Sequence, residues 1–295
     1  MDGFFGVPPQ ALFGQLLIGL INGSFYALLS LGLAVIFGLL NIINFTHGAQ
    51  YMMGAFCTWF LLNKLGTGYW WSLLLVPVVV GLFGALIERL MLKRLYQLDH
   101  LYGLLLTFGL ALIIQGLFRI EFGSSGPPYP IPRALEGGND LGFMFLPNYR
   151  AWVIVASLAV CFSTWFVIEK TQLGSYLRAA TENPQLVQAF GINVPRMITL
   201  TYGFGVGLAA LAGVMAAPIY QVSPQMGADL IIVVFAVVVI GGMGSIMGSI
   251  VTGFALGLIE GLTKVFYPEA SNTVIFIIMA IVLMIKPAGL FGSRK

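Results

Sequence analysis

Charged residues are scarce in this sequence. Only 8% of its 295 residues are Asp, Glu, Lys or Arg, against about 25% in an average soluble domain. Hydrophobic residues make up 59% of the chain, and its mean hydropathy is +0.95. So few charges cannot cover a water-facing surface, whereas side chains that face lipid need no solvation. We therefore predict an integral membrane protein that crosses the lipid bilayer several times.

Metal-binding residues are also few. The sequence has two histidines, His47 and His100, and two cysteines, Cys57 and Cys161. Both cysteines lie in apolar segments, which is typical of small buried hydrophobic residues and not of a disulfide or a metal site. We expect no metal site and no cofactor.

Catalytic motifs are missing as well. The sequence contains neither the G-x-x-x-x-G-K-[ST] loop that binds nucleotide phosphates nor the G-x-S-x-G of a serine nucleophile. Carboxylates inside membranes usually mark proton or ion relays, and Glu88 and Glu260 are the two candidates. The net charge is +3, and no basic run is longer than Lys93-Arg94, which argues against a nucleic-acid surface. We predict no catalytic residues, and a conduit without its own energy source.

Apolar segments account for most of the length, since a membrane helix needs about 20 residues. The first candidate, 11–40, is one long or two short spans, and 229–243 and 249–263 are short and separated by GGMGSIMGS (241–249). Backbone this flexible occurs at membrane depth only when it is packed in protein or lines a polar cavity. We predict an all-α fold of eight to ten transmembrane helices with broken or re-entrant segments, in a single domain, 1–295. The other candidate spans are 47–63, 70–92, 101–119, 151–168, 199–220 and 272–286.

Basic residues divide unevenly between the ends of these segments. Nine of the fourteen Lys and Arg residues fall on one side and five on the other. Because cytoplasmic loops carry the excess of Lys and Arg, we expect loops 93–100 and 169–198 and the C-terminus in the cytoplasm. The Pro- and Gly-rich loop 120–149 is then external. The first ten residues lack the basic start of a cleaved signal peptide, so we expect the N-terminus to be retained.

Polar residues gather in NIINFTHGAQ (41–50), between two uncharged apolar segments. Asn41, Asn44 and Gly48 are spaced i, i+3 and i+7, which predicts one helix face, with His47 beside it. These groups either bond to one another and to the backbone at a helix break, at about 1 kcal/mol per bond, or line a translocation path, as broken transporter helices do. The sequence leaves both alternatives open.

Three further features are expected inside the membrane. Asn22 and Ser24 form a smaller polar interruption with the same two alternatives. Glu260 is either a structural carboxylate with a partner or a gate residue. Many of the 37 glycines recur every four residues, which favours close packing of helices. The glycines in question are Gly203 and Gly207 on one segment and Gly253, Gly257 and Gly261 on another.

The longest predicted cytoplasmic loop contains helix signals. Asn183 is a good N-cap and Pro184 suits the first helical position, while Gly191 suits the residue just past a helix end. These residues predict a short helix, 184–190, and 175–181 could form another turn of helix. The segment is either an ordinary surface loop or a coupling helix that fits a cytoplasmic partner.

Four stretches spread over nearly the whole chain carry a family resemblance. The long loop is similar to the coupling-loop motif of ABC importer permeases, in RAATENPQLVQAFGINVPR. Within that class the chain resembles branched-chain amino acid permeases, above all the shorter of that system's two permease subunits. The stretches that carry this resemblance are NGSFYALLSLGLAVIFGLLNIINFTHGAQYMMGA (22–55), GGMGSIMGSIVTGFALGLIEGL (241–262) and KPAGLFG (286–292).

The resemblance implies a membrane-spanning permease subunit that imports branched-chain or related amino acids and resides in the cell (inner) membrane. It also implies two cytoplasmic ATP-binding subunits that hydrolyse the ATP, a second homologous permease subunit and an external solute-binding protein. The family commonly has NFAHG where this chain has Thr46, and permeases for urea and short amides share these motifs. The coupling role falls on Arg178, Ala180, Glu182, Asn183, Pro184 and Gly191.

Two other classes compete with this interpretation. A self-contained channel or secondary carrier for a small neutral solute would explain the uncharged spans equally well, but not the capped helix in loop 169–198. A membrane enzyme would need a catalytic set that the sequence lacks.

Overall fold

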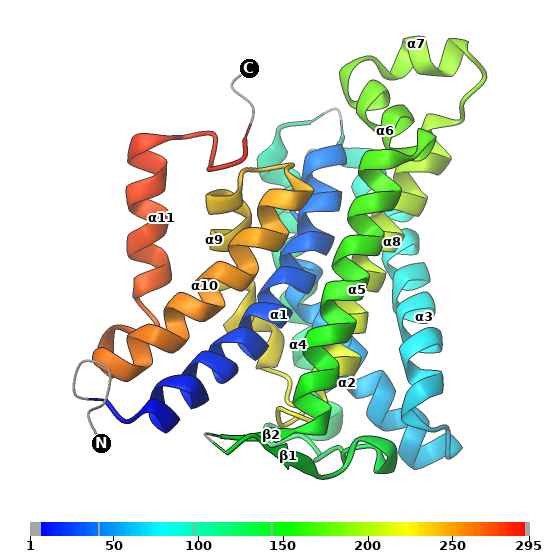
Figure 1. The fold of residues 1–295 in the computed structure, drawn as a ribbon. Coiled ribbons are helices and arrows are strands. Elements are labelled where there is room, and N and C mark those ends of the chain that lie inside the picture. Colours follow the sequence, from blue (N-terminus) through cyan, green and yellow to red (C-terminus); the bar gives the residue numbers. More distant parts are fainter. Residues whose placement is uncertain (1–6, 41, 97, 143, 293–295) are drawn as a thin grey trace. The chain divides into compact units, whose positions relative to one another are not determined.

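The computed structural model describes residues 7–40, 42–96, 98–142 and 144–292. Within these residues the chain forms eleven α-helices, and its only strands are two short ones (Figure 1). The protein is an all-α polytopic membrane protein. In chain order the elements are α1 (Pro9–Leu40), α2 (Thr46–Leu65), α3 (Tyr69–Leu90), η1 (Leu92–Leu95), α4 (His100–Phe122), η2 (Arg133–Leu135), β1 (Gly138–Asp140), β2 (Phe145–Pro147), α5 (Asn148–Lys170), α6 (Gln172–Glu182), α7 (Pro184–Ala189), α8 (Val194–Ala216), α9 (Met226–Gly241), α10 (Ile246–Phe266), η3 (Pro268–Ala270) and α11 (Val274–Ile285).

Every apolar segment singled out in the sequence coincides with a helix. Six helices in the described part of the chain are long and apolar enough to cross a membrane: α1, α3, α4, α5, α8 and α10. Helices α9 and α11 are apolar but shorter. The segment 11–40 is one continuous helix, not two short ones.

The chain divides into two compact units, and each is described by itself. The first comprises Met1–Ser30, Pro130–Cys161 and Val233–Lys295, and the second Leu31–Tyr129 and Phe162–Ile232. In the second unit α8 packs along α3 and α2, and α2 also packs against α4. Small residues allow this close approach, because a Cβ added at Gly203 would lie 3.0 Å from the Gly81 carbonyl oxygen and one at Gly207 would lie 3.0 Å from that of Pro77.

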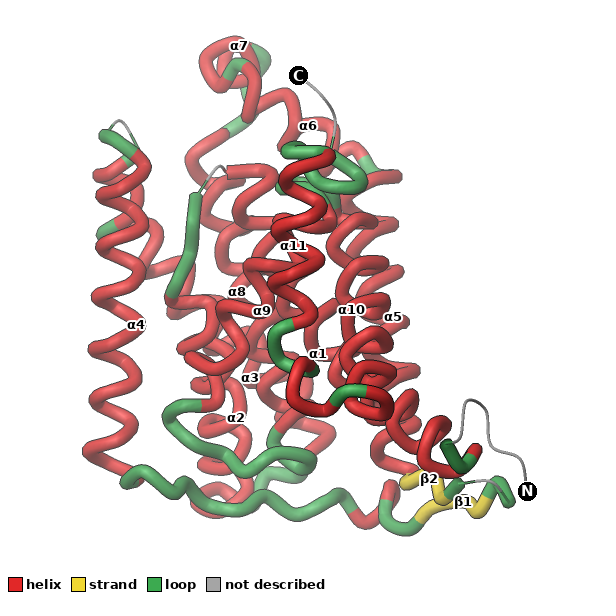
Figure 2. Tube along the Cα trace, turned by 90° about the vertical axis from the view of Figure 1, so that its left-hand side faces the viewer, coloured by secondary structure: helices red, strands yellow, loops and turns green. Residues whose placement is uncertain are grey.

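The first unit is held by similar contacts between α10 and the beginning of α1. A Cβ added at Gly257 would lie 2.4 Å from the Gly19 carbonyl oxygen, and Gly253 and Gly261 meet the α1 backbone in the same way. Helix α10 also packs against α11. Strands β1 and β2 pair antiparallel, with Asn139 opposite Leu146, and Figure 2 shows how small this strand content is beside the helices.

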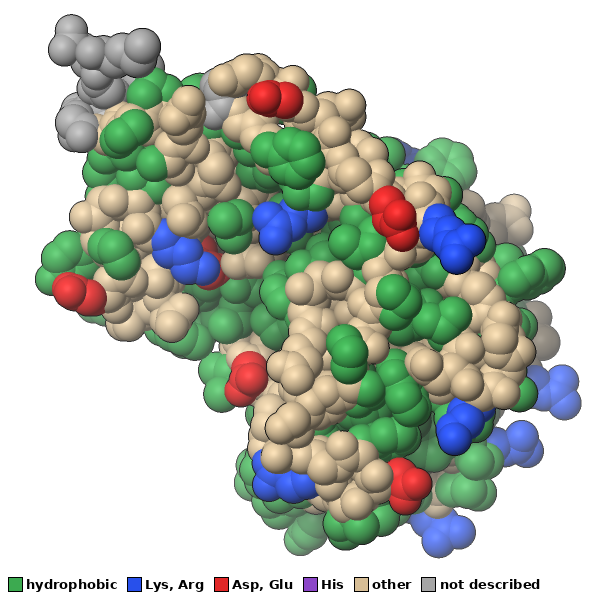
Figure 3. Space-filling model, turned by 90° about the horizontal axis from the view of Figure 1, so that it is seen from below, with side chains coloured by type: hydrophobic (Ala, Val, Ile, Leu, Met, Phe, Trp, Pro, Cys, Tyr) green, Lys and Arg blue, Asp and Glu red, His purple; other side chains and the backbone are tan. Residues whose placement is uncertain are grey.

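The molecular surface carries few charged side chains, because only 8% of the residues are charged. On the face shown in Figure 3 they are scattered among hydrophobic and uncharged groups. Large apolar side chains such as Trp71, Leu82 and Leu105 are more than 60% exposed, as expected of helix faces that contact lipid or another membrane subunit.

Candidate translocation site and coupling loop

The chain leaves the helical conformation between α1 and α2. Residues 42–45 form a loop, visible in Figure 2 as a non-helical stretch beside α4. Two of its backbone groups contact Thr107 of α4. The Thr107 hydroxyl accepts from the Phe45 N–H (3.2 Å), and its one hydrogen is shared between the Ile43 carbonyl (3.2 Å) and the Leu104 carbonyl of α4 itself (3.1 Å). A side chain therefore replaces the hydrogen bonds that a helix would have supplied, as a break at membrane depth requires.

The predicted helix face in this stretch is wrong. Asn44 lies in the loop, whereas Gly48 lies in the first turn of α2, so the two share no helix face. Asn41, the third predicted member, lies outside the described residues. A spacing rule assumes a continuous helix, and the contacts of Thr107 stabilise a break instead.

Asn44 belongs to a set of buried polar side chains that bond to one another. Its amide donates to the Gln50 side-chain carbonyl (3.2 Å), and the Gln50 amide donates to the Thr46 hydroxyl (3.2 Å). The Thr46 hydroxyl in turn donates to the Asn44 side-chain carbonyl. All three residues are fully buried. Their bonds to one another fix the loop onto the first turn of α2, which corresponds to the helix-break alternative for Asn44.

His47 and Gly48 face neighbouring helices. The His47 ring lies 3.0 Å from the position of a Cβ added at Gly32 of α1, and the histidine is fully buried. A Cβ added at Gly48 would lie 2.4 Å from the Gly227 carbonyl oxygen. The start of α2 and the start of α9 thus touch through their backbones, which only glycine permits.

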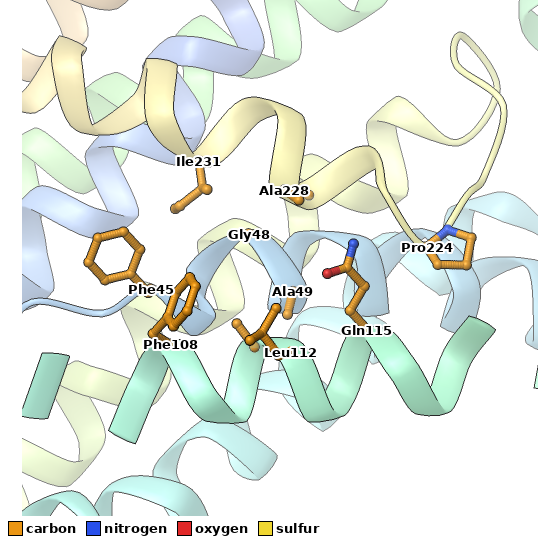
Figure 4. A pocket seen from close by; sticks show the side chains of 11 residues that line it. Phe45, Gly48, Ala49, Phe108, Leu112, Gln115, Pro224, Ala228 and Ile231 are labelled. Atoms are coloured by element: carbon orange, nitrogen blue, oxygen red, sulfur yellow. The ribbon is translucent and has the colours of Figure 1, made fainter. Parts of the chain in front are cut away.

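A small cavity lies beside this contact. Its volume is about 70 Å³, and it is lined by α2, α4 and the start of α9 (Figure 4). The lining is apolar apart from Gln115, whose amide donates a hydrogen bond to the Gln225 side-chain carbonyl. The lining residues are Phe45, Gly48, Ala49, Phe108, Ala111, Leu112, Gln115, Pro224, Gly227, Ala228 and Ile231.

Glu260 is surrounded by hydrogen-bond donors in the first unit. The Tyr26 hydroxyl (2.6 Å) and the Asn22 amide (3.3 Å) donate to its carboxylate, and Lys264 forms an ion pair with it one turn along α10. Glu260 is buried. Ser24, by contrast, donates to the Leu20 carbonyl of its own helix (3.0 Å). These bonds favour a structural role for Glu260 at the contact between α1 and α10.

The loop between α5 and α8 contains two short helices, α6 and α7. The Asn183 side chain caps α7 by accepting from the Leu186 N–H (3.0 Å), Pro184 occupies its first position, and Gly191 follows it with a φ of 83°. Inward-facing Ala180, Val187 and Val194 pack together and anchor the loop on α8.

Polar contacts also hold this loop. Arg178 donates to the Ile168 carbonyl at the end of α5 (3.2 Å) and pairs with Glu169 (3.4 Å). Glu182 is exposed. Leu186 and Phe190 are 55% and 77% exposed. These two side chains lie four residues apart and so form a small exposed apolar surface on the loop.

A buried carboxylate connects the loop region to α3. Glu88 accepts from the Tyr96 hydroxyl (2.5 Å) and from the Thr199 hydroxyl of α8 (2.6 Å). Burial, followed by the hydrogen bond to Glu88, raises the pKa of Tyr96 above its usual value, so Tyr96 remains a donor at neutral pH. The last turn of α3 and the first turns of α8 are therefore tied together beneath α6 and α7.

Comparison with known proteins decides the family. The model of the family described as "Branched-chain amino acid transport system / permease component" matches residues 15–283. The chain belongs to this family.

Individual relatives cover nearly the whole chain. The high-affinity branched-chain amino acid transport system permease protein LivH of Escherichia coli K12 is 29% identical over 95% of this chain and 96% of its own length. The corresponding permease protein BraD of Pseudomonas aeruginosa is 29% identical over the same shares. The Escherichia coli permease protein LivM is 27% identical over 92% of this chain and 68% of its own length. No solved structure matches the chain.

The sequence did not predict several residues of these sites in this branched-chain amino acid permease. Gln115 stands alone in an apolar span and Gln225 in a loop, and nothing in the sequence links residues 110 positions apart. Tyr26 and Lys264 were missed as partners of Glu260, although the i, i+4 spacing of Glu260 and Lys264 was a usable signal. Among the described residues no group of three or more His, Cys, Asp and Glu could hold a metal ion.

Proposed function

We propose that this chain is the membrane-spanning permease subunit of an ATP-driven importer that moves branched-chain or related amino acids into the cell through the inner membrane. The chain itself catalyses no covalent step. ATP hydrolysis takes place on two cytoplasmic ATP-binding subunits, a second homologous permease completes the membrane part, and an external solute-binding protein delivers the solute. Family membership supports the permease role, and the likeness to both LivH and LivM supports a paired permease.

The observation that carries this proposal is the α6–α7 loop. It is capped at Asn183, anchored by Val187 and exposes Leu186 and Phe190. A self-contained carrier has no use for a rigid loop with an exposed apolar surface. In the proposed cycle, closure of the ATP-binding subunits pushes on this loop, and the Glu88–Thr199 bond passes the displacement to α3.

The roles of the polar residues follow from their contacts. Asn44 and Gly48 stabilise the break at the start of α2, and the neighbouring His47 packs against Gly32 of α1. Asn22 and Glu260 stabilise the contact of α1 with α10, and Ser24 is satisfied within α1. The five glycines on α8 and α10 allow the helices to touch.

Transport by purified components tests the proposal. Proteoliposomes that contain the chain with its partner permease and ATP-binding subunits, supplied with the binding protein, should take up leucine only with ATP. Proteoliposomes that contain the chain alone should pass neither leucine nor urea. Leucine or urea flux through the chain alone, without ATP, would establish the carrier instead. Uptake of urea or a short amide, but not leucine, by the complete assembly would assign the alternative substrate class.

A further inference from the structure

The 70 Å³ cavity lies halfway along α4. Its α4 lining residues, from Phe108 to Gln115, occupy the middle of a helix that spans His100–Phe122. At 1.5 Å per residue, Ala111 is roughly 16 Å from the start of α4, about half of a 30 Å bilayer core. The cavity is therefore at the depth at which transporters bind their solutes.

Two helices begin at this depth. Helix α2 starts at Thr46, after the break, and α9 starts at Met226, after the turn at 223–225. Their first turns touch through Gly48 and Gly227, and both glycines line the cavity. Solute sites in secondary transporters are typically formed where such discontinuous helices meet.

The size and lining of the cavity suit a small branched alkyl group. A water molecule occupies about 30 Å³ of the liquid, so 70 Å³ accommodates roughly two to three groups of that size, such as the branched end of an alkyl chain. The Phe45 and Phe108 rings form one wall in an edge-to-face pair, with centroids 6.0 Å apart. Leu112 and Ile231 add aliphatic surface, and the lining side chains Phe108 and Leu112 are about half exposed.

One pair of amides supplies the polar end. Gln115 donates to the Gln225 side-chain carbonyl. Within the described residues the Gln115 carbonyl and the Gln225 amide make no other side-chain hydrogen bond. Figure 4 shows the Gln115 amide between α4 and α9 at the edge of the cavity. An apolar pocket with a few placed polar groups is the usual form of a small-molecule site.

We propose that this cavity holds the branched side chain of the transported amino acid, while the Gln115–Gln225 amides hydrogen-bond its ammonium or carboxylate group. The inference rests on the proposed function and adds the place and the residues of solute contact. A lipid acyl chain could fill the apolar part but has no use for the amide pair, so the amides favour an amphipathic solute.

Filling the cavity tests the inference. Ala111→Leu adds three carbon atoms to its wall, and in the reconstituted complex the initial rate of L-leucine uptake at low concentration should fall about tenfold or more, as for a blocked alkyl pocket. Gly109→Leu is the matched control. It makes a larger change two residues away on α4, where an added Cβ meets nothing within 4 Å, and uptake should stay near wild type.

A second readout does not depend on transport rate. In a complex whose permease lacks Cys57 and Cys161, Ala111→Cys should react with a small thiol reagent, and saturating L-leucine should slow that reaction severalfold. Labelling unaffected by leucine, or normal leucine uptake by Ala111→Leu, would overturn the inference. Protection of Ala111→Cys by a short fatty acid, but not by leucine, would assign the cavity to lipid. Wild-type protein that transports no branched-chain amino acid would instead contradict the proposed function.

Discussion

At the scale of single residues, Thr46 connects two other side chains. Its hydroxyl donates to Asn44 and accepts from Gln50, at a position where the permeases that the sequence resembles commonly have alanine. The hydroxyl thus adds two hydrogen bonds that stabilise the break before α2. The Asn44–Gln50 bond of 3.2 Å would remain without the hydroxyl.

We expect Thr46→Ala to insert normally but to lower the free energy of unfolding by about 1 kcal/mol, the usual contribution of a polar contact inside a membrane protein. Thermal unfolding in detergent measures this. Thr58→Ala is the matched control, because Thr58 is equally buried but bonds only to the Gly54 carbonyl of its own helix (2.8 Å), so its loss should be smaller. Equal losses in the two variants would show that Thr46 contributes nothing specific.

Glu260 provides a second test at this scale. Glu260→Ala removes the acceptor of Tyr26, Asn22 and Lys264, and a buried partner left without its bond costs about 1–3 kcal/mol. We therefore expect less folded protein, measured by fluorescence size-exclusion chromatography. Glu260→Gln, which keeps an acceptor oxygen, should recover part of the loss. Normal folding with abolished uptake in both variants would make Glu260 a gate residue.

The sequence predicts single residues better than their partners. It identifies Asn44 and Glu260, because polar groups are conspicuous in apolar surroundings. It cannot supply Gln225 as the partner of Gln115 or Tyr26 as the partner of Glu260, because these pairs form only when distant helices pack.

At the scale of elements, local signals determine some helix ends and not others. The end signals of α7 are all local: the cap at Asn183, the first-turn proline and the positive φ at Gly191. Its bounds could therefore be predicted from sequence. The break before α2 depends on Thr107, 62 residues from Phe45, and a spacing rule misses it.

Gly191 tests the importance of α7. Val cannot adopt a φ of 83° without strain of about 1–3 kcal/mol, so Gly191→Val should displace α7 while the spans insert normally. ATP hydrolysis stimulated by the binding protein should then fall to near the basal rate. Gly191→Asn, which tolerates this conformation, should remain coupled. Normal stimulation of ATP hydrolysis in a Gly191→Val complex would show that the α6–α7 loop does not couple the permease to the ATP-binding subunits.

At the scale of the whole molecule, the arrangement of the second unit agrees with the division of basic residues. The Glu88–Thr199 bond joins the end of α3 to the start of α8, so loops 93–100 and 169–198 leave the unit at the same end. Helix α4 carries the chain from that end to 123–126, where Gln221 bonds to the Ser125 carbonyl (2.8 Å).

Site-directed labelling in intact cells measures the orientation. In a variant without Cys57 and Cys161, we expect Ser175→Cys to react with a membrane-impermeant thiol reagent only after the cells are opened. Leu141→Cys, which is exposed in the predicted external loop, should react in intact cells. The opposite pattern would invert the orientation, and labelling of both positions from one side would contradict it.

The bonds of Thr107 to Ile43 and Phe45 also determine the order in which the helices can assemble during synthesis. The ribosome adds about 5–20 residues per second, so the 62 residues between Phe45 and Thr107 take roughly 3 to 12 s to make. During that interval α4 cannot yet bond to the break, and the hydrocarbon interior offers no substitute. We therefore expect α2 to stay at the membrane interface until α4 has been synthesised and to take its final position only then. The helices of this membrane protein would thus not assemble in sequence order.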